Sequence, residues 1–296
     1  MIQAPSLTPK RLFSDPPLTV ATPQKPSFVE YTDGHAVVFL HNRADQREVL
    51  DLWRWDTGDA QARSWLRSED LTDLILGTAK QETETERAER ERLRLFASGI
   101  TAFLVRPGYA EVLAIVQGQG VLVSLLGGEP KRLTIAAQRH AGFQFSPKGR
   151  FLSYVRAGDL YVLEIASGLE QRVTHDGSTT VQSGLADFIA QEEMHRFEGH
   201  WWHPQETCIA YQRTDEQPIP VAHRHDIDAD EIRVIEQRYP YAGGPNADVR
   251  LGLYELDSGE TRWLEYQQQG EDYLARVQWL DAELWVQIQD RSQQTL

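Results

Sequence analysis

Short stretches of alternating apolar and polar residues run along most of this chain, with turn residues between them. Residues 36–40 and 49–55 are two such stretches, and Asp56, Thr57 and Gly58 supply the turn that follows. Strands joined at such short spacing are typical of an antiparallel meander. The same pattern returns in the apolar runs 100–105, 112–116, 121–125, 273–279 and 284–288.

A longer unit also recurs. Residues 143–174 read as an aromatic residue, a Ser-Pro-x-Gly turn, a strand, a tight turn, a second strand, a Ser-Gly turn and a third strand. Residues 202–211 repeat the first half of this unit, and residues 52–58 and 252–259 repeat the second half. Four-stranded units that recur at about 40–50 residues are typical of propeller blades. We therefore predict an all-β fold over residues 28–296, an incomplete β-propeller of about four to five blades.

Two segments near the N-terminus depart from the strand pattern. Residues 1–27 are rich in proline and predict an extended, irregular lead-in. Residues 69–97 carry charges of both signs at i,i+4 spacing, and Ser68 is a candidate cap at their start. We predict one long charged helix there, which on the pattern alone is a solvated surface helix.

Residues 218–238 interrupt a later blade. On the pattern alone this charged segment is a flexible surface loop. His223 and His225 would lie on the same side of a strand, but a metal site needs further ligands, and we expect no metal.

Composition and charge exclude several classes of function. The net charge of −14 and the pI of about 5.1 argue against nucleic-acid binding and against binding to anionic membranes. The chain contains no run of about 18 apolar residues, so no membrane span is predicted. Cys208 is the single cysteine, so no intrachain disulfide is possible, and we expect it to pack as a small apolar residue. Gly118 and Gly120 lack the third glycine of a dinucleotide motif, so we expect a hairpin turn and no cofactor.

The most distinctive chemistry lies in two adjacent glutamates, Glu192 and Glu193. Neighbouring carboxylates repel each other, so a fold that orders both must supply a cationic partner. A free α-ammonium group suits that role because its three N–H donors can be shared between two carboxylates. The alternative interpretation is an ordinary solvated acidic turn.

The surrounding motifs resemble the dipeptidyl peptidase IV family of serine exopeptidases, over essentially the whole chain. The similar segments are Asp187-Phe-Ile-x-x-Glu-Glu-Met194, then Gly199-x-Trp-Trp-x-Pro204, Ile209-Ala-Tyr211 and Val234-Ile-Glu-Gln-Arg-Tyr-Pro-Tyr-Ala-Gly243. The resemblance implies that Glu192 and Glu193 hold the free N-terminus of a peptide substrate.

The resemblance has two further implications for sites and partners. One of Arg90, Arg92 and Arg94, in the charged segment, would reach the substrate cavity and bind a substrate carbonyl. An extended hairpin that starts at Val221 and ends at Gln237 would contact the partner subunit of a homodimer.

Members of this family join an eight-bladed propeller to an α/β-hydrolase domain that carries the catalytic serine, aspartate and histidine. No Gly-x-Ser-x-Gly motif occurs in this chain, nor a long alternation of helices and parallel strands. We therefore expect a fragment, a truncated gene product or one piece of a larger assembly, with no catalytic residue of its own. The start of the chain lacks an apolar signal core, and because relatives are often periplasmic and otherwise cytoplasmic, the compartment stays open.

Two main hypotheses of function follow, with a third beside them. The first is the substrate-anchoring part of a peptidase that removes N-terminal Xaa-Pro or Xaa-Ala dipeptides and is inactive without the hydrolase domain. The second is a non-catalytic interaction module or a truncated gene product, and a weaker third is an unrelated sugar- or peptide-binding propeller. The glutamate pair and the arginine run favour the first, because a pure scaffold does not need them.

Overall fold

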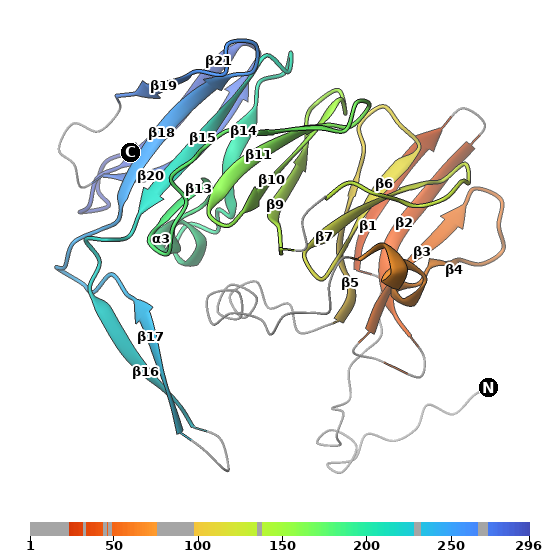
Figure 1. The fold of residues 1–296 in the computed structure, drawn as a ribbon, viewed down its shortest axis with the longest axis horizontal. Coiled ribbons are helices and arrows are strands. Elements are labelled where there is room, and N and C mark those ends of the chain that lie inside the picture. Colours follow the sequence, from red (N-terminus) through yellow and green to blue (C-terminus); the bar gives the residue numbers. More distant parts are fainter. Residues whose placement is uncertain are drawn as a thin grey trace.

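The computed structural model describes residues 24–31, 34–43, 46, 49–75, 98–134, 138–227, 232–265 and 272–296. Most of these residues form β-strands in several antiparallel sheets, which follow one another in an arc (Figure 1). The prediction of an all-β fold is therefore confirmed. No helix in the described ranges is long and apolar enough to cross a membrane.

The first two blades share one hydrogen-bonded sheet. They are joined by a short parallel contact, in which Val49 and Leu50 pair with Ser98 and Gly99, while the strands within each blade pair antiparallel. The first strand starts at Gln24, within the last four residues of the segment 1–27 for which an extended, irregular lead-in was expected. The strands are β1 (Gln24–Tyr31), β2 (Gly34–Asn42), β3 (Val49–Asp56), β4 (Arg63–Leu66), β5 (Ser98–Val105), β6 (Glu111–Val116), β7 (Gln119–Ser124) and β8 (Lys131–Arg132).

Two further blades and the start of a fifth complete the described chain. The third and fourth blades are separate antiparallel sheets, and the fifth is represented by one hairpin. The third blade contains β9 (Ala141–Phe145), β10 (Phe151–Arg156), β11 (Asp159–Glu164) and β12 (Leu169–Arg172). The fourth contains β13 (Val181–Leu185), β14 (Glu198–Trp202), β15 (Cys208–Asp215), β18 (Asp248–Glu255) and β19 (Thr261–Leu264), and the fifth begins with β20 (Tyr273–Leu280) and β21 (Glu283–Gln289).

The hydrophobic core lies between neighbouring blades. Strand β10 shows how this arises, because alternate side chains of a strand point to opposite faces. Leu152 and Tyr154 pack toward the second blade, whereas Phe151 and Val155 pack toward the fourth. Both faces of such a strand are buried, which explains its nearly continuous apolar sequence. Cys208 is buried in the cluster between the fourth and fifth blades, as expected of a small apolar side chain.

The long charged helix predicted over residues 69–97 is not supported. Its described start is a 3₁₀ helix, η1 (Ser68–Leu74), and residues 76–97 lie outside the described part of the chain. Ser68 is not its N-cap, because Arg67 occupies that position and Ser68 is the first residue of the helix. The Ser68 N–H donates to Oδ1 of buried Asp51 at 2.9 Å. The buried side chain of Leu71 packs into the core of the first two blades. The segment is thus attached to β3 instead of starting a solvated helix.

A two-stranded ribbon leaves the fourth blade between β15 and β18. It consists of β16 (Val221–Ile227) and β17 (Ile232–Arg238), which pair antiparallel. Figure 1 shows this ribbon extending away from the arc of sheets. It occupies the segment in which the extended hairpin was expected, and we call it the arm.

Candidate functional site

The two glutamates lie at the end of a short helix that interrupts the fourth blade between β13 and β14. This helix, α3 (Phe188–Glu192), begins after Asp187, whose Oδ2 accepts a hydrogen bond from the Ala190 N–H at 3.3 Å. Glu192 is its last residue, and Glu193 is the C-cap, with its N–H bonded to the Ile189 carbonyl at 2.9 Å. Both glutamate side chains are exposed.

The chain reverses direction directly after the pair. His195 takes a positive φ of 51°, and the N–H of Arg196 then donates to the carbonyl of Ala190 at 2.9 Å. A left-handed residue followed by such a bond is a common way to end a helix and to satisfy its last carbonyls. The backbone on both sides of Glu193 is therefore held by hydrogen bonds.

A buried polar network fixes this turn to two strands. The guanidinium of Arg196 donates to the Glu198 carbonyl at 2.6 Å, to Oε1 of Gln212 at 2.8 Å and to the Leu274 carbonyl at 2.9 Å. Gln212 in turn donates to Oδ1 of Asp187 at 3.0 Å. Arg196 and Gln212 are both buried. Their hydrogen bonds link α3 to β15 and, across the blade boundary, to β20.

The glutamate carboxylates are available to a ligand. Within the described part of the chain, neither Glu192 nor Glu193 has a side-chain hydrogen bond or an ion pair. A nearby cation, Arg276 of β20, instead donates to the carbonyl of Met194 at 2.8 Å. Two neighbouring carboxylates at the end of a fixed turn can share the donors of one ammonium group.

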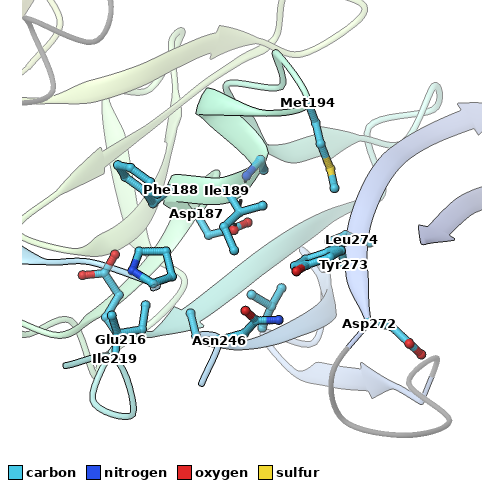
Figure 2. Close-up of a pocket in the computed structure, with 14 residues that line it drawn as sticks. Asp187, Phe188, Ile189, Met194, Glu216, Ile219, Asn246, Asp272, Tyr273 and Leu274 are labelled. Carbon is cyan, nitrogen blue, oxygen red and sulfur yellow. Dashed lines mark hydrogen bonds between the residues drawn. The ribbon is translucent and has the colours of Figure 1, made fainter. Parts of the chain in front are cut away.

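A small pocket lies between α3 and the starts of β18 and β20 (Figure 2). Met194 lines it together with Tyr273 and Leu274, but neither glutamate does. The glutamate carboxylates are thus not part of the pocket wall. The remaining lining residues are Asp187, Phe188, Ile189, Ala190, Glu216, Ile219, Pro240, Asn246, Ala247, Val249 and Asp272.

A buried histidine joins the third and fourth blades. Nδ1 of His200 donates to the Gly184 carbonyl at 2.7 Å, so Nε2 accepts from the hydroxyl of Ser153 at 2.9 Å. Ser153 Oγ also accepts from Nε1 of Trp202 at 2.9 Å. Burial lowers the pKa of His200 to about 4. A serine next to a histidine can act as a nucleophile, but both residues are fully buried, so this pair is a structural joint.

The other residues singled out from the sequence either lie outside the described part of the chain or form no further site within it. Arg90, Arg92 and Arg94 lie outside the described part of the chain. His223 lies 3.3 Å from a carboxylate oxygen of Glu236, and no cluster of metal-ligating side chains occurs among the residues that the structure describes.

Sequence reasoning missed the supporting residues Arg196, Gln212 and Arg276. Arg196 stands inside the motif around the glutamates, but nothing in its local pattern indicates a buried guanidinium. Arg276 is an exposed arginine in a strand and has no distinguishing neighbour in the sequence.

Comparison with known proteins places the chain in a family. The model of the "Dipeptidyl peptidase IV (DPP IV) N-terminal region" matches residues 114–296. Dipeptidyl peptidase 8 of Mus musculus is 25% identical over 271 residues, which cover 78% of this chain and 30% of that protein. A putative dipeptidyl aminopeptidase of Schizosaccharomyces pombe is 33% identical over 146 residues, which cover 46% of this chain and 18% of that protein.

A solved structure has a similar fold. The crystal structure of Porphyromonas gingivalis dipeptidyl peptidase 4 aligns with a TM-score of 0.66 and 18% identity, over 98% of this chain and 39% of that one. At this identity the likeness concerns the fold, a β-propeller region. The chain spans less than two-fifths of the length of each of these proteins. From the family match over residues 114–296, this chain belongs to the dipeptidyl peptidase IV N-terminal region family.

Proposed function

We propose that this chain is the substrate-anchoring propeller portion of a serine dipeptidyl peptidase, in which Glu192 and Glu193 bind the N-terminal ammonium group of a peptide. One observation carries the proposal. The two exposed carboxylates have no partner among the described residues, although the turn that follows them is fastened to β15 and β20 by the buried side chain of Arg196. Membership of the family supports it.

The physical role of the pair is to position the substrate. Bringing one ammonium between two carboxylates relieves their mutual repulsion and forms charge-assisted hydrogen bonds of about 1.5–3 kcal/mol each. Two extended residues span about 7 Å, so a fixed amine anchor presents the second peptide bond for attack. The pair thus acts as a ruler and transfers no proton.

The remaining chemistry belongs to other parts of the enzyme. The serine, aspartate and histidine would lie in an α/β-hydrolase domain, which would cleave after Xaa-Pro or Xaa-Ala. One of Arg90, Arg92 and Arg94 would bind a substrate carbonyl and keep the dipeptide extended.

A binding experiment on the chain tests the proposal. We expect the tripeptide Ala-Pro-Ala to bind, and its N-acetylated form to bind at least about tenfold more weakly, because acetylation removes the ammonium charge. Glu192→Gln and Glu193→Gln should each weaken binding of the free-amine tripeptide about tenfold or more. Glu198→Gln is the matched control, since Glu198 is exposed in the same segment but outside the pair.

Two results would contradict the proposal. Equal binding of the free and acetylated tripeptides would favour the alternative of a non-catalytic interaction module. An equal loss in all three glutamate variants would mean that the overall acidic surface attracts the peptide, without a specific site.

We also propose that the arm contacts a second copy of this chain. In the antiparallel register of β16 and β17, alternate residues share a face, and four apolar residues on one face are exposed. Exposed apolar surface on a projecting ribbon is typical of an interaction site. These residues are Val221, Ile227, Ile232 and Val234, with exposed fractions of 46%, 72%, 65% and 57%.

Light scattering tests the arm proposal. We expect the mass of a dimer for the unmodified chain and of a monomer for the double variant Ile227→Glu, Ile232→Glu. The control is Leu126→Glu, which places the same charge at an exposed apolar position of the second blade. A monomer for the unmodified chain across micromolar concentrations would refute the proposal.

A further inference from the structure

Strand β20 holds the glutamate turn at two points. Its Leu274 carbonyl accepts a hydrogen bond from Arg196 at 2.9 Å, and its Arg276 guanidinium donates to the Met194 carbonyl at 2.8 Å. Met194 follows Glu193 directly, and Arg196 comes two residues later. Figure 2 shows Met194 between α3 and the start of β20. The turn that carries the glutamates therefore rests on the fifth blade as well as on its own.

Substitutions of Arg196 and of Arg276 are expected to have different effects on the fold. Arg196 is buried in a network, so its loss would leave several buried groups without partners and disturb the fold. The side chain of Arg276 is exposed, and its second hydrogen bond goes to the carbonyl of the adjacent Ala275 at 2.7 Å. Substitutions of exposed residues usually change overall stability little. A change at Arg276 can thus alter the turn without unfolding the chain.

The positive charge of Arg276 lies at a part of the turn where negative charge is concentrated. The carbonyls at the end of α3 and the adjacent glutamates together concentrate negative charge at this point. The positively charged guanidinium of Arg276 reaches the turn by donating to the carbonyl oxygen of Met194. In the described structure it forms no ion pair of 4.0 Å or less with either glutamate. Both carboxylates therefore remain available to a ligand.

We propose that Arg276 is a positioning residue for the ammonium site. By holding the Met194 carbonyl, it fixes the direction in which Glu193 presents its carboxylate, although it does not touch the ligand. The inference rests on the proposed function, and it makes the fifth blade part of the peptide-binding unit.

The two methionines of the chain, Met1 and Met194, make a direct test possible. With ¹³C-methyl methionine, the chain has two labelled methyl groups, and one of them directly follows Glu193. We expect titration with Ala-Pro-Ala to shift the Met194 signal, and Arg276→Ala to raise the dissociation constant about five- to tenfold. Arg276→Lys, which keeps a cationic donor, should restore most of the affinity.

A stability measurement and a matched control variant complete the test of Arg276. Arg276→Ala should leave the urea unfolding midpoint unchanged although it weakens binding. If Arg276 had a merely structural role, weaker binding would be accompanied by a lower midpoint. Arg150→Ala is the control, because Arg150 is an exposed arginine that pairs with Glu164 at 2.7 Å in the third blade. We expect it to bind the tripeptide like the unmodified chain.

The outcomes separate this inference from the function on which it rests. If Glu193→Gln weakens binding but Arg276→Ala does not, the inference about Arg276 is overturned and the ammonium site stands. If neither Glu192→Gln nor Glu193→Gln changes binding, the ammonium site itself is overturned, and the inference with it. A loss of binding in Arg276→Ala that lysine does not restore, together with a lower unfolding midpoint, also overturns the inference.

Discussion

Nε2 of Gln212 donates a hydrogen bond to Oδ1 of Asp187 at 3.0 Å, and both side chains are buried. The second oxygen of Asp187 accepts the Ala190 N–H and caps α3. One carboxylate therefore both starts the helix and fastens it to β15. The position of the glutamate pair is determined by a residue that comes five positions before Glu192.

The double role of Asp187 predicts a large effect on stability. Asp187→Ala removes a helix cap, which costs about 1 kcal/mol, and leaves buried donors without an acceptor, which costs about 1–3 kcal/mol. We expect the free energy of unfolding in urea to fall by about 2–4 kcal/mol. Asp187→Asn keeps an acceptor for the Ala190 N–H and should lose less. Equal losses in the two variants would show that the cap contributes nothing.

Acid should weaken the joint between the third and fourth blades. The pKa of His200 is about 4 in the folded chain and about 6.5 when unfolded, because burial disfavours the charged ring. Between these values the unfolded chain binds a proton that the folded chain does not. Stability is therefore full above about pH 6.5 and falls as the pH drops toward 4, by on the order of 3 kcal/mol from this residue.

The measurement is the difference in urea unfolding free energy between pH 7.5 and pH 5. His200→Gln should reduce that difference, whatever its effect on stability at pH 7.5. His175→Gln, at an exposed histidine, is the control and should keep the difference of the unmodified chain. His140, whose pKa burial also lowers to about 4, contributes in the same range and remains in both variants. An unchanged difference in His200→Gln would refute this account.

Gly199, two positions before Trp201, is expected to contribute strongly to the stability of the fold. A β-carbon at Gly199 would lie 2.2 Å from the carbonyl carbon and 2.4 Å from the α-carbon of Leu185 on the neighbouring strand. Backbone atoms cannot move aside as a flexible side chain can, so Gly199→Ala should separate β13 from β14 and cost more than about 2 kcal/mol. Gly34→Ala, where a β-carbon would meet the Tyr31 side chain at 3.1 Å, should cost less. Thermal unfolding of the three proteins compares them, and a Gly199→Ala midpoint equal to that of the unmodified chain would contradict the prediction.

The chain alone should not hydrolyse dipeptide substrates. Its sequence contains no Gly-x-Ser-x-Gly motif, and the buried Ser153–His200 pair is closed to substrate. We expect no release of chromophore from a Gly-Pro chromogenic substrate above the buffer control. Turnover that a serine-directed inhibitor blocks, and that Ser153→Ala abolishes, would prove this expectation wrong.

Local patterns in the sequence determined the class of fold and the most distinctive chemistry. Alternation of apolar residues has the period of a strand, and turn residues mark its ends, so short strands in repeated units could be predicted without any long-range information. Glu192 and Glu193 could be recognised because they are adjacent in the sequence and stand within a contiguous motif that resembles a known family. The long helix over residues 69–97 was predicted from charge spacing and from Ser68 as a candidate cap. Neither signal takes account of Leu71 packing against the first two blades or of the Ser68 N–H bond to Asp51.

Only the tertiary structure decided how the glutamates are held. The bonds from Arg196 to Leu274 and from Arg276 to Met194 join residues that are 78 and 82 positions apart. Pairings at such separations depend on which blades become neighbours, and a local pattern carries no information about that. The sequence therefore determines that strands form and that two carboxylates stand together. The packing of the fourth blade against the fifth determines where those carboxylates are held, because backbone carbonyls that accept these bonds are brought into reach only by the fold.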